Sequence, residues 1–218
     1  MKSIIKAIWE IIRKSFPHYS FKEKLDLNAN HLNGGKVKRL REGDCDVRTF
    51  ISTRDEVLNR VIKRNNLDVG TYDERALKCL NYVIKTIKYM PDERSRNKLT
   101  EFWSYPSETL YWKDGDCEDG SILLASLMIC AGIPEERVRV ACGNVVDPAK
   151  QKMFGHAYVL YYQESYDNWR IMDWCFYPDE HYSNHVEILG DWSKPLADDK
   201  YKNRWYSFNS KYVWDGEN

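Results

Sequence analysis

Three residue types that together perform nucleophilic catalysis occur in the order cysteine, histidine, aspartate, at Cys117, His156 and Asp173. A cysteine attacks as its thiolate, and the unpaired N–H groups and partial positive charge of a helix N-terminus favour that anion. Cys117 stands just before an apolar pattern with helical spacing, so we expect it in the first turn of a helix. The sequence therefore predicts a nucleophile at position 117.

The charges beside Cys117 oppose this chemistry, because nearby negative charge raises the pKa of a thiol. Four acidic residues flank it: Asp114, Asp116, Glu118 and Asp119. A partner that can carry positive charge is therefore needed, and His156 opens a β-type run directly after a glycine. We expect Asp173 to accept the Nδ1 proton of His156, so that the other ring nitrogen faces Cys117.

The helices that would position these residues are marked by capping residues and by apolar spacing. Capping boxes are predicted at Thr53–Glu56 and at Thr71–Glu74, each just before an apolar pattern with helical spacing. The helix that begins near Cys117 should stop at Gly132, with Pro134 beyond it. Residues 3–16 form a further amphipathic pattern, which we expect to dock on the rest of the chain or on a partner chain.

The chain after Pro134 changes to short β-type runs at residues 138–146, 157–162 and 169–174. Turn residues separate the last two runs, and a hairpin there would bring His156 and Asp173 together to within two or three residues of register. An antiparallel sheet packed on the helices is the simplest assembly. We expect irregular structure in residues 17–50, which include a basic patch, and an aromatic segment beyond Pro178 that wraps against the core.

Several ordered blocks resemble the transglutaminase-like superfamily of papain-type cysteine enzymes, especially its small microbial and viral members. The blocks are Trp103–Leu110, Gly115–Gly120, Ala131–Pro134, Arg137–Val140, Gly155–Val159 and Trp169–Asp173. The resemblance implies that Cys117 is the nucleophile, His156 the general base and Asp173 the third member. It also implies an α+β fold with a transglutaminase-like or papain-like core, in which the cysteine helix packs on the antiparallel sheet bearing the other two.

Further site residues are suggested around this set. The backbone N–H of Cys117 is the first candidate for an oxyanion donor, and analogy with the family adds the side chains of Trp103 and Trp112. A tryptophan in such a position more often belongs to the core. Supporting roles near the helix start, as caps or second-layer contacts, are expected for Asp116, Glu118 and Asp119.

Composition bounds the class of protein. The 33 basic and 33 acidic side chains balance, so charge predicts neither a nucleic acid nor an anionic membrane as partner. The six cysteines show no Cys-x-x-Cys pair, which favours reduced thiols over disulfides or zinc, and we expect no cofactor and no metal. Charged residues interrupt the N-terminal apolar run, so we expect a cytoplasmic protein without a membrane span. The resemblance to small viral members of the superfamily adds a viral or phage origin to the expectations.

The expected organisation is an N-terminal helix and irregular segment at residues 1–50, a catalytic domain at 51–182, and an aromatic tail at 183–218. The expected function is acyl transfer from peptide or side-chain amides through a thioester, with hydrolysis of peptide or protein substrates favoured. Two alternatives stay open. One is cross-linking by a glutamine transglutaminase, and the other is a binding or structural protein that keeps the fold without catalysis.

Overall fold

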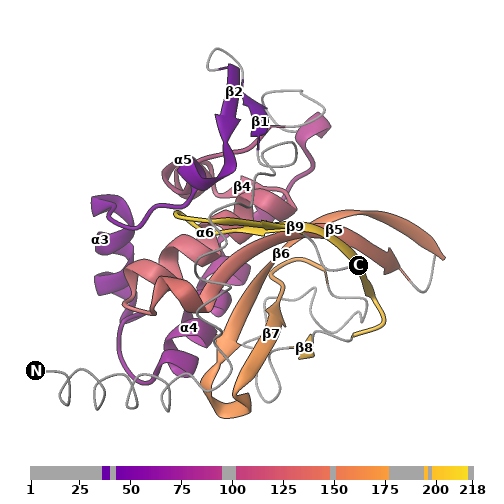
Figure 1. The fold of residues 1–218 in the computed structure, drawn as a ribbon. Coiled ribbons are helices and arrows are strands. Elements are labelled where there is room, and N and C mark those ends of the chain that lie inside the picture. The colour runs from indigo at the N-terminus through magenta and orange to yellow at the C-terminus, as the bar shows by residue number, and fades with distance from the viewer. Residues whose placement is uncertain are drawn as a thin grey trace, which may run out of the picture.

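Helices cover one side of an antiparallel sheet in the computed structural model of this chain (Figure 1). The structure describes residues 36–39, 43–94, 102–147, 151–176, 194–195 and 198–215. The predicted helix at residues 3–16 lies outside the described residues. The α+β architecture predicted from the sequence is confirmed.

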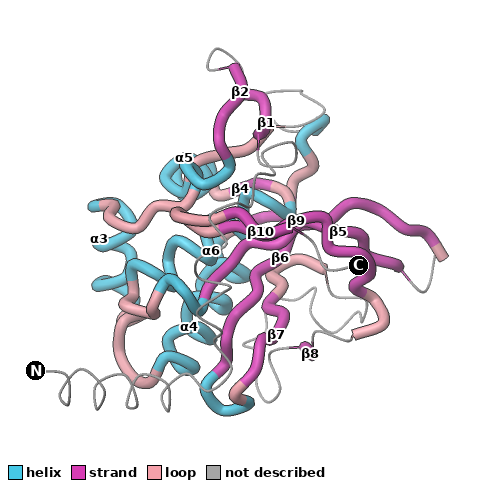
Figure 2. Tube along the Cα trace, viewed as in Figure 1, coloured by secondary structure: helices cyan, strands magenta, loops and turns pink. Residues whose placement is uncertain are grey.

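The central helix is α6 (Cys117–Cys130), and it is buried almost all round. It packs against α3 (Glu56–Asn65), α4 (Tyr72–Thr86) and α5 (Pro106–Trp112) on one side and against the sheet on the other (Figures 1 and 2). A helix that is apolar on every face must lie inside a core. The helix that carries Cys117 is therefore enclosed by the fold.

The helix ends mostly follow the predicted signals. Thr71 and Glu74 form the predicted capping box at the start of α4. The predicted box at Thr53–Glu56 is wrong, because Asp55 caps α3 by accepting the backbone amides of Val57 at 2.7 Å and Leu58 at 3.2 Å. Aspartate is among the strongest N-caps, and here it stands one residue before the helix. The stop after α6 is confirmed, since Gly132 has φ +88°.

Within the described residues, the sheet has six antiparallel strands in the order β10-β9-β5-β6-β7-β8. Their bounds are β5 (Val138–Asp147), β6 (Lys152–Gln163), β7 (Asn168–Met172), β8 (Lys194–Pro195), β9 (Tyr201–Phe208) and β10 (Val213–Asp215). The predicted runs after Pro134 correspond to β5, β6 and β7. No local pattern predicted a strand near the C-terminus, yet β9 lies between β10 and β5 in the sheet (Figure 1).

The two faces of the sheet carry different cores. On β6, Ala157, Val159 and Tyr161 join the large cluster that includes α6, whereas Tyr158 and Leu160 belong to a smaller cluster. This alternation follows from the period of two in a strand. His156 shares its face with Tyr158, against which its ring stacks at 6.2 Å between centroids. The histidine thus belongs to the face with the smaller cluster.

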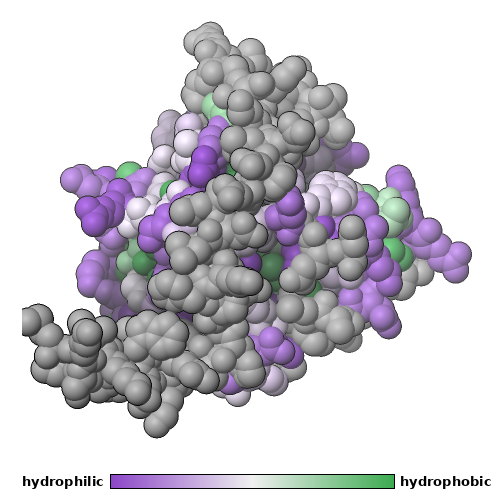
Figure 3. Space-filling view, in the orientation of Figure 1, coloured by the Kyte–Doolittle hydropathy of each residue, from purple (hydrophilic) through white to green (hydrophobic). Residues whose placement is uncertain are grey.

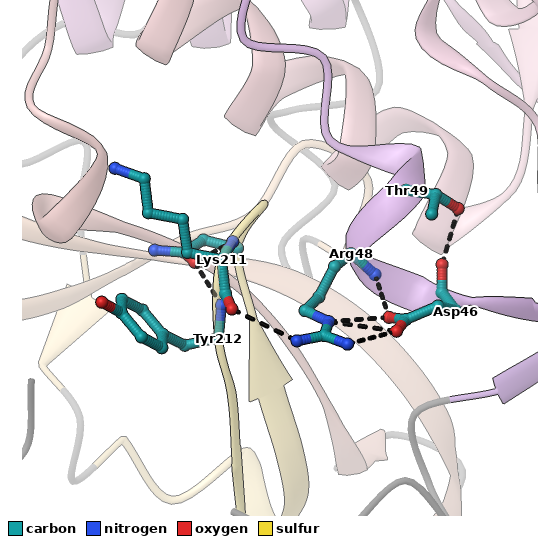
Figure 4. Close-up of polar contacts among 6 residues, drawn as sticks. Asp46, Arg48, Thr49, Lys211 and Tyr212 are labelled. Atoms are coloured by element: carbon teal, nitrogen blue, oxygen red, sulfur yellow. Dashed lines mark hydrogen bonds and ion pairs between the residues drawn. The ribbon is translucent and has the colours of Figure 1, made fainter. Parts of the chain in front are cut away.

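The chain before α3 and the C-terminal strands are joined by Arg48. Its guanidinium pairs with Asp46 and donates to the carbonyl of Lys211 at 3.4 Å (Figure 4). The nearby strands β1 (Lys36–Arg39) and β2 (Gly43–Asp46) form an antiparallel hairpin. The prediction of irregular structure for residues 17–50 is wrong for these two strands, whose few apolar residues gave no strand pattern.

None of the helices in the described part of the chain is long and apolar enough to cross a membrane. The face seen in Figure 3 is mainly hydrophilic over the described residues, with small separate apolar areas.

Candidate active site

Cys117 is the first residue of α6, as predicted. Two features fix this helix start against the sheet. The indole N–H of Trp174 donates to the carbonyl oxygen of Cys117 at 3.1 Å. Gly120 makes room for the indole, because a Cβ at that position would lie 2.1 Å from the Trp174 ring. The sequence places a glycine one turn into an otherwise apolar helix for this close approach.

The thiol of Cys117 lies beside the backbone of the residue after His156. The Ala157 amide donates to the thiol, and the Ala157 carbonyl accepts the hydroxyl of Ser121 at 3.1 Å. Cys117 and Ser121 are four residues apart, so they share one face of the helix. The ladder between β6 and β7 ends with the pair Val159–Met172, and α6 contacts the strand just beyond that end.

The surroundings of the Cys117 thiol favour its protonated form. Its Sγ donates to Glu118 Oε2 at 3.2 Å, and no hydrogen bond joins it to the ring of His156, with both residues fully described. Burial raises the pKa of Cys117 well above its ordinary value, and the charges of Glu118, Cys175 and Asp116 raise it further. The Ala157 amide lowers it by less. The helix N-terminus predicted to favour a thiolate is therefore outweighed by burial and by the acidic neighbours.

His156 and Asp173 meet directly, as the hairpin predicted. His156 Nε2 lies 2.7 Å from Asp173 Oδ2, and both side chains are buried. The predicted use of Nδ1 is wrong. Because Met172 pairs with Val159, Asp173 lies diagonally across the ladder from His156, and the ring nitrogen farther from the backbone makes the reach. Nδ1 is therefore the ring nitrogen that does not bond to Asp173.

Asp173 is held by donors on both of its oxygens. Oδ1 accepts the backbone amides of Cys175 and Phe176 at 3.1 Å each, and Oδ2 accepts the hydroxyl of Tyr201 at 2.7 Å as well as bonding to His156. Burial alone would raise the pKa of Asp173, but His156, the Phe176 amide and the Tyr201 hydroxyl outweigh it and keep the pKa below its ordinary value. The carboxylate is therefore ionised and fixed in place.

Sequence reasoning missed two residues that lie in this site. Cys175 donates its thiol to Asp173 Oδ1 at 3.8 Å, and Tyr201 bonds to Oδ2 of the same carboxylate. The position of Cys175, two residues after Asp173, was a signal that could have found it. Tyr201 gave no such signal, because it is 28 residues from Asp173 in a segment without a predicted strand.

The tryptophans proposed as oxyanion donors lie in different surroundings. Trp103 is buried and packs between Phe50 and Phe208, with ring centroids 5.6 Å and 5.8 Å away. Trp112 is about half exposed and packs edge-on against Tyr111 at 4.7 Å. Nothing in this geometry gives either indole an oxyanion role, and that role stays a prediction.

The acidic residues expected to support the site are brought together around the helix start. Asp116 is the N-cap residue of α6, although its side chain makes no capping hydrogen bond. Glu118 accepts the Cys117 thiol, and Asp119 accepts the backbone amide of Ser104 at 2.7 Å. Asp119 thereby holds the chain that leads into α5 against the start of α6.

Three carboxylates in this region could hold a cation. One oxygen each of Asp92, Asp116 and Asp119 lie within 4.8 Å of one another, and Asp92 and Asp119 are buried. Burial raises the pKa of Asp119 well above its ordinary value, and the charges of Asp116 and Asp92 add to the rise. Oxygen donors of this kind suit calcium. A second close group, His156, Asp173 and Cys175, suits a metal less well, because both oxygens of Asp173 already accept hydrogen bonds.

The arrangement can perform base-assisted attack by a thiol. The buried carboxylate of Asp173 orients the imidazole of His156. The next residue in the chain, Ala157, has the backbone amide that bonds to the Cys117 thiol. The backbone N–H of Cys117, in the first turn of α6, has no partner within its own helix and can donate to a developing oxyanion.

Comparisons with known proteins agree with this architecture. The family model of the transglutaminase-like superfamily matches residues 58–174, more than half of the chain. LapG from Legionella pneumophila has a similar structure, with TM-score 0.51 and 17% identity over 76% of this chain and 88% of LapG. No curated protein sequence is significantly similar.

Two further structures are less similar. Calcium-bound LapG from L. pneumophila gives a TM-score of 0.46 at 17% identity, over 76% of this chain and 88% of LapG. A candidate cysteine protease from Cytophaga hutchinsonii gives 0.42 at 16% identity, over 63% of this chain and 45% of that protein. At such identities only the fold is compared, whereas the family match covers the Cys117 helix, His156 and Asp173. The chain belongs to the transglutaminase-like superfamily.

Proposed function

We propose that this chain is a cysteine-dependent acyl-transfer enzyme that hydrolyses peptide or side-chain amides through a thioester on Cys117. The observation that carries the proposal is the buried contact of 2.7 Å between His156 and Asp173, positioned beside the first turn of the Cys117 helix. A purely structural protein would have no need to bury and fix a histidine and a carboxylate next to a thiol.

The reaction begins with the thiol leaving Glu118 and turning to the free Nδ1 of His156. As Sγ attacks the amide carbonyl, Nδ1 takes the thiol proton, and Asp173 stabilises the imidazolium that forms. The tetrahedral oxyanion is met by the backbone N–H of Cys117. His156 then returns the proton to the departing amine, which leaves a thioester. Water attacks the thioester with His156 again as base, and this releases the acid and restores the thiol.

Because the thiol is protonated at rest, His156 acts as a base during the attack, with no ion pair formed beforehand. Hydrolysis is favoured over cross-linking by the resemblance to small members of the superfamily, which are mostly regarded as peptidases or amidases. Cross-linking would follow the same steps up to the thioester, with an amine replacing water as the final acceptor.

A mixed peptide library incubated with the protein in ¹⁸O-labelled water separates these reactions by mass spectrometry. Peptide hydrolysis gives shorter products with ¹⁸O in the new carboxyl group, and deamidation gives an intact peptide with one ¹⁸O in place of the amide nitrogen. Cross-linking gives linked masses without the label. Cys117→Ala is the control. Absence of any product with the wild-type protein would count against an enzyme, and equal products with Cys117→Ala would exclude the mechanism.

A second candidate function is calcium binding beside the start of α6. The cluster of Asp92, Asp116 and Asp119 favours it, because three carboxylates lie close together there. A divalent cation there would offset the repulsion among these carboxylates and tie the segment before α5 to the start of α6. The test compares the thermal midpoint in calcium, in magnesium and with EGTA, for the wild-type protein and for Asp92→Asn. We expect calcium to raise the midpoint of the wild type and to have little effect on the variant. An unchanged wild-type midpoint would contradict this role.

A further inference from the structure

Asp173 receives a hydrogen bond from outside the set of Cys117, His156 and Asp173. The Tyr201 hydroxyl donates to Oδ2 at 2.7 Å, the same oxygen that lies 2.7 Å from His156 Nε2. The opposite oxygen is held by two backbone amides at 3.1 Å each. The carboxylate therefore cannot rotate without breaking a hydrogen bond on one side, and Tyr201 is the side chain that completes this restraint.

We propose that Tyr201 is a positioning residue of the active site, which fixes the Asp173 carboxylate and, through it, the ring of His156. The kinetic consequence of this inference rests on the proposed function, whereas the hydrogen bond and its effect on Asp173 do not. Hydrogen bonds to a charged group are stronger than those between neutral groups, so the loss of this one should be measurable.

The ring of Tyr201 is packed among aromatic side chains while its hydroxyl bonds to the carboxylate. It is buried, with 7% of its surface exposed. Tyr158 packs edge-on against it at 4.8 Å between centroids, and Phe176 does so at 6.0 Å. A phenylalanine at position 201 would keep these contacts and lose only the hydroxyl.

Two irregularities in the pairing of β5 with β9 bring Tyr201 to this place. Val140 pairs with Phe208, and regular continuation of that register would put Asn203 opposite Val145. The register shifts twice, at Cys142/Gly143 and at Gly143/Val145, so that Tyr201 stands there instead. Gly143 permits the shift, because a Cβ on it would lie 2.6 Å from the carbonyl oxygen of Asn203. Bulges that redirect a side chain are common beside active sites.

Tyr201 also lies beyond residues 58–174, which the family model matches. The C-terminal strand β9 therefore contributes a side chain to this site in addition to completing the sheet.

Several titratable and charged groups lie around Asp173 on the elements packed against it. They are Tyr158, Cys175, Arg204, and Asp116 and Glu118 at the start of α6. The side chains of His156 and Tyr201 both lower the pKa of Asp173.

The test compares Tyr201→Phe with Tyr162→Phe as a matched control. Tyr162 is also on the sheet, and its hydroxyl donates to the side chain of Asp167 at 2.9 Å. The first readout is the titration of Asp173, followed through a ¹³Cγ label by NMR. We expect Tyr201→Phe to raise the pKa of Asp173 and Tyr162→Phe to leave it unchanged. The second readout is kcat/KM, which we expect to fall about tenfold in Tyr201→Phe and to stay near wild type in the control.

A wild-type measurement guards against a variant that fails to fold. A ¹³Cζ label on Tyr201 should change its chemical shift at the pH at which Asp173 titrates. An unchanged Asp173 titration in Tyr201→Phe, or a Tyr201 label that ignores that titration, would overturn the inference. So would a loss of kcat/KM that is equal in the two variants. If the wild-type protein has no turnover, the proposed function fails while the two NMR readouts still decide the role of Tyr201.

Discussion

The two halves of the candidate site are held in different ways. The His156–Asp173 half is closely restrained, because both oxygens of one buried carboxylate accept hydrogen bonds from side chains and backbone amides. The Cys117 half is less restrained, because its thiol bonds to one neighbouring carboxylate and one backbone amide. In the proposed mechanism the base is therefore already oriented, whereas the thiol must leave Glu118 before it can react.

This difference separates two requirements of cysteine catalysis. A general base works only in one orientation and tautomer, so hydrogen bonds are concentrated on the carboxylate that orients it. A thiol that stays protonated until substrate arrives is protected from side reactions of the thiolate. Variants in the first half should abolish turnover, while variants in the second half should change the resting reactivity of Cys117.

The largest effect is expected for Asp173→Asn. We expect turnover to fall on the order of 10⁴-fold, as for the matching change in a serine triad, because an amide can present the wrong group to the imidazole. The measurement is kcat/KM on any substrate found in the peptide library. Asp167→Asn is the control, since that residue bonds to Tyr162 away from the site. Near-normal rates in Asp173→Asn would place the third member elsewhere.

A packing change at the nucleophile should come next. Gly120→Ala would gain about 1 kcal/mol in helix propensity, but its Cβ would lie 2.1 Å from the Trp174 ring. Overpacking costs about 1–3 kcal/mol, so we expect a net loss of stability and of turnover. The measurements are the urea midpoint and kcat/KM.

The double variant Gly120→Ala with Trp174→Phe serves as the control for that clash. A smaller ring should recover part of the lost stability, although the hydrogen bond to the Cys117 carbonyl stays lost. If the double variant is less stable than Gly120→Ala by the full cost of Trp174→Phe alone, steric conflict is not the cause.

A smaller effect is expected at the resting thiol. The charge of Glu118 lies beside the Cys117 thiol and raises the pKa of that thiol. Glu118→Gln removes this charge. Alkylation of Cys117 by iodoacetamide should then become several-fold faster at neutral pH, because more of it is thiolate. Mass spectrometry of each cysteine-containing peptide gives the rates, with Cys45 in the same sample as the reference. A Cys117 rate that is unchanged or slower in Glu118→Gln would show that the carboxylate does not restrain the thiol.

The smallest expected effect concerns acid stability. The pKa of Asp173 is lowered in the folded state, so its contribution is fully present above about pH 4, the ordinary value of an unfolded aspartate. It is lost as the pH falls through the lower folded value. The free energy of unfolding of wild type and Asp173→Asn should therefore converge below pH 4. A difference that stays constant from pH 7 to pH 3 would contradict the lowered pKa.

The sequence predicted those parts of the site that depend on local patterns. The helix that begins at Cys117 was marked by its apolar run and by Gly132, and the hairpin that joins His156 to Asp173 was marked by alternation and turn residues. The resemblance to a known superfamily joined these local signals into one site. The helix pattern and the hairpin pattern each involve residues that are close together in the sequence.

The parts that could not be predicted depend on contacts between distant segments. Tyr201 reaches Asp173 only after two register shifts between β5 and β9, which no local pattern encodes. The choice of Nε2 on His156 depends on a diagonal reach across the ladder. The protonated state of Cys117 depends on burial, which outweighs the helix N-terminus once the chain has folded.

The central claim is that Cys117 carries the acyl group, and the neighbouring thiol of Cys175 offers a strict comparison within one site. The most direct measurement is an acid quench of the protein during turnover of the peptide library, followed by mass spectrometry of its cysteine-containing peptides. We predict an acyl adduct on the peptide that contains Cys117, with none on the peptide that contains Cys175 and none in Cys117→Ala. Turnover with the adduct on Cys175, or turnover that persists in Cys117→Ala, would contradict the account.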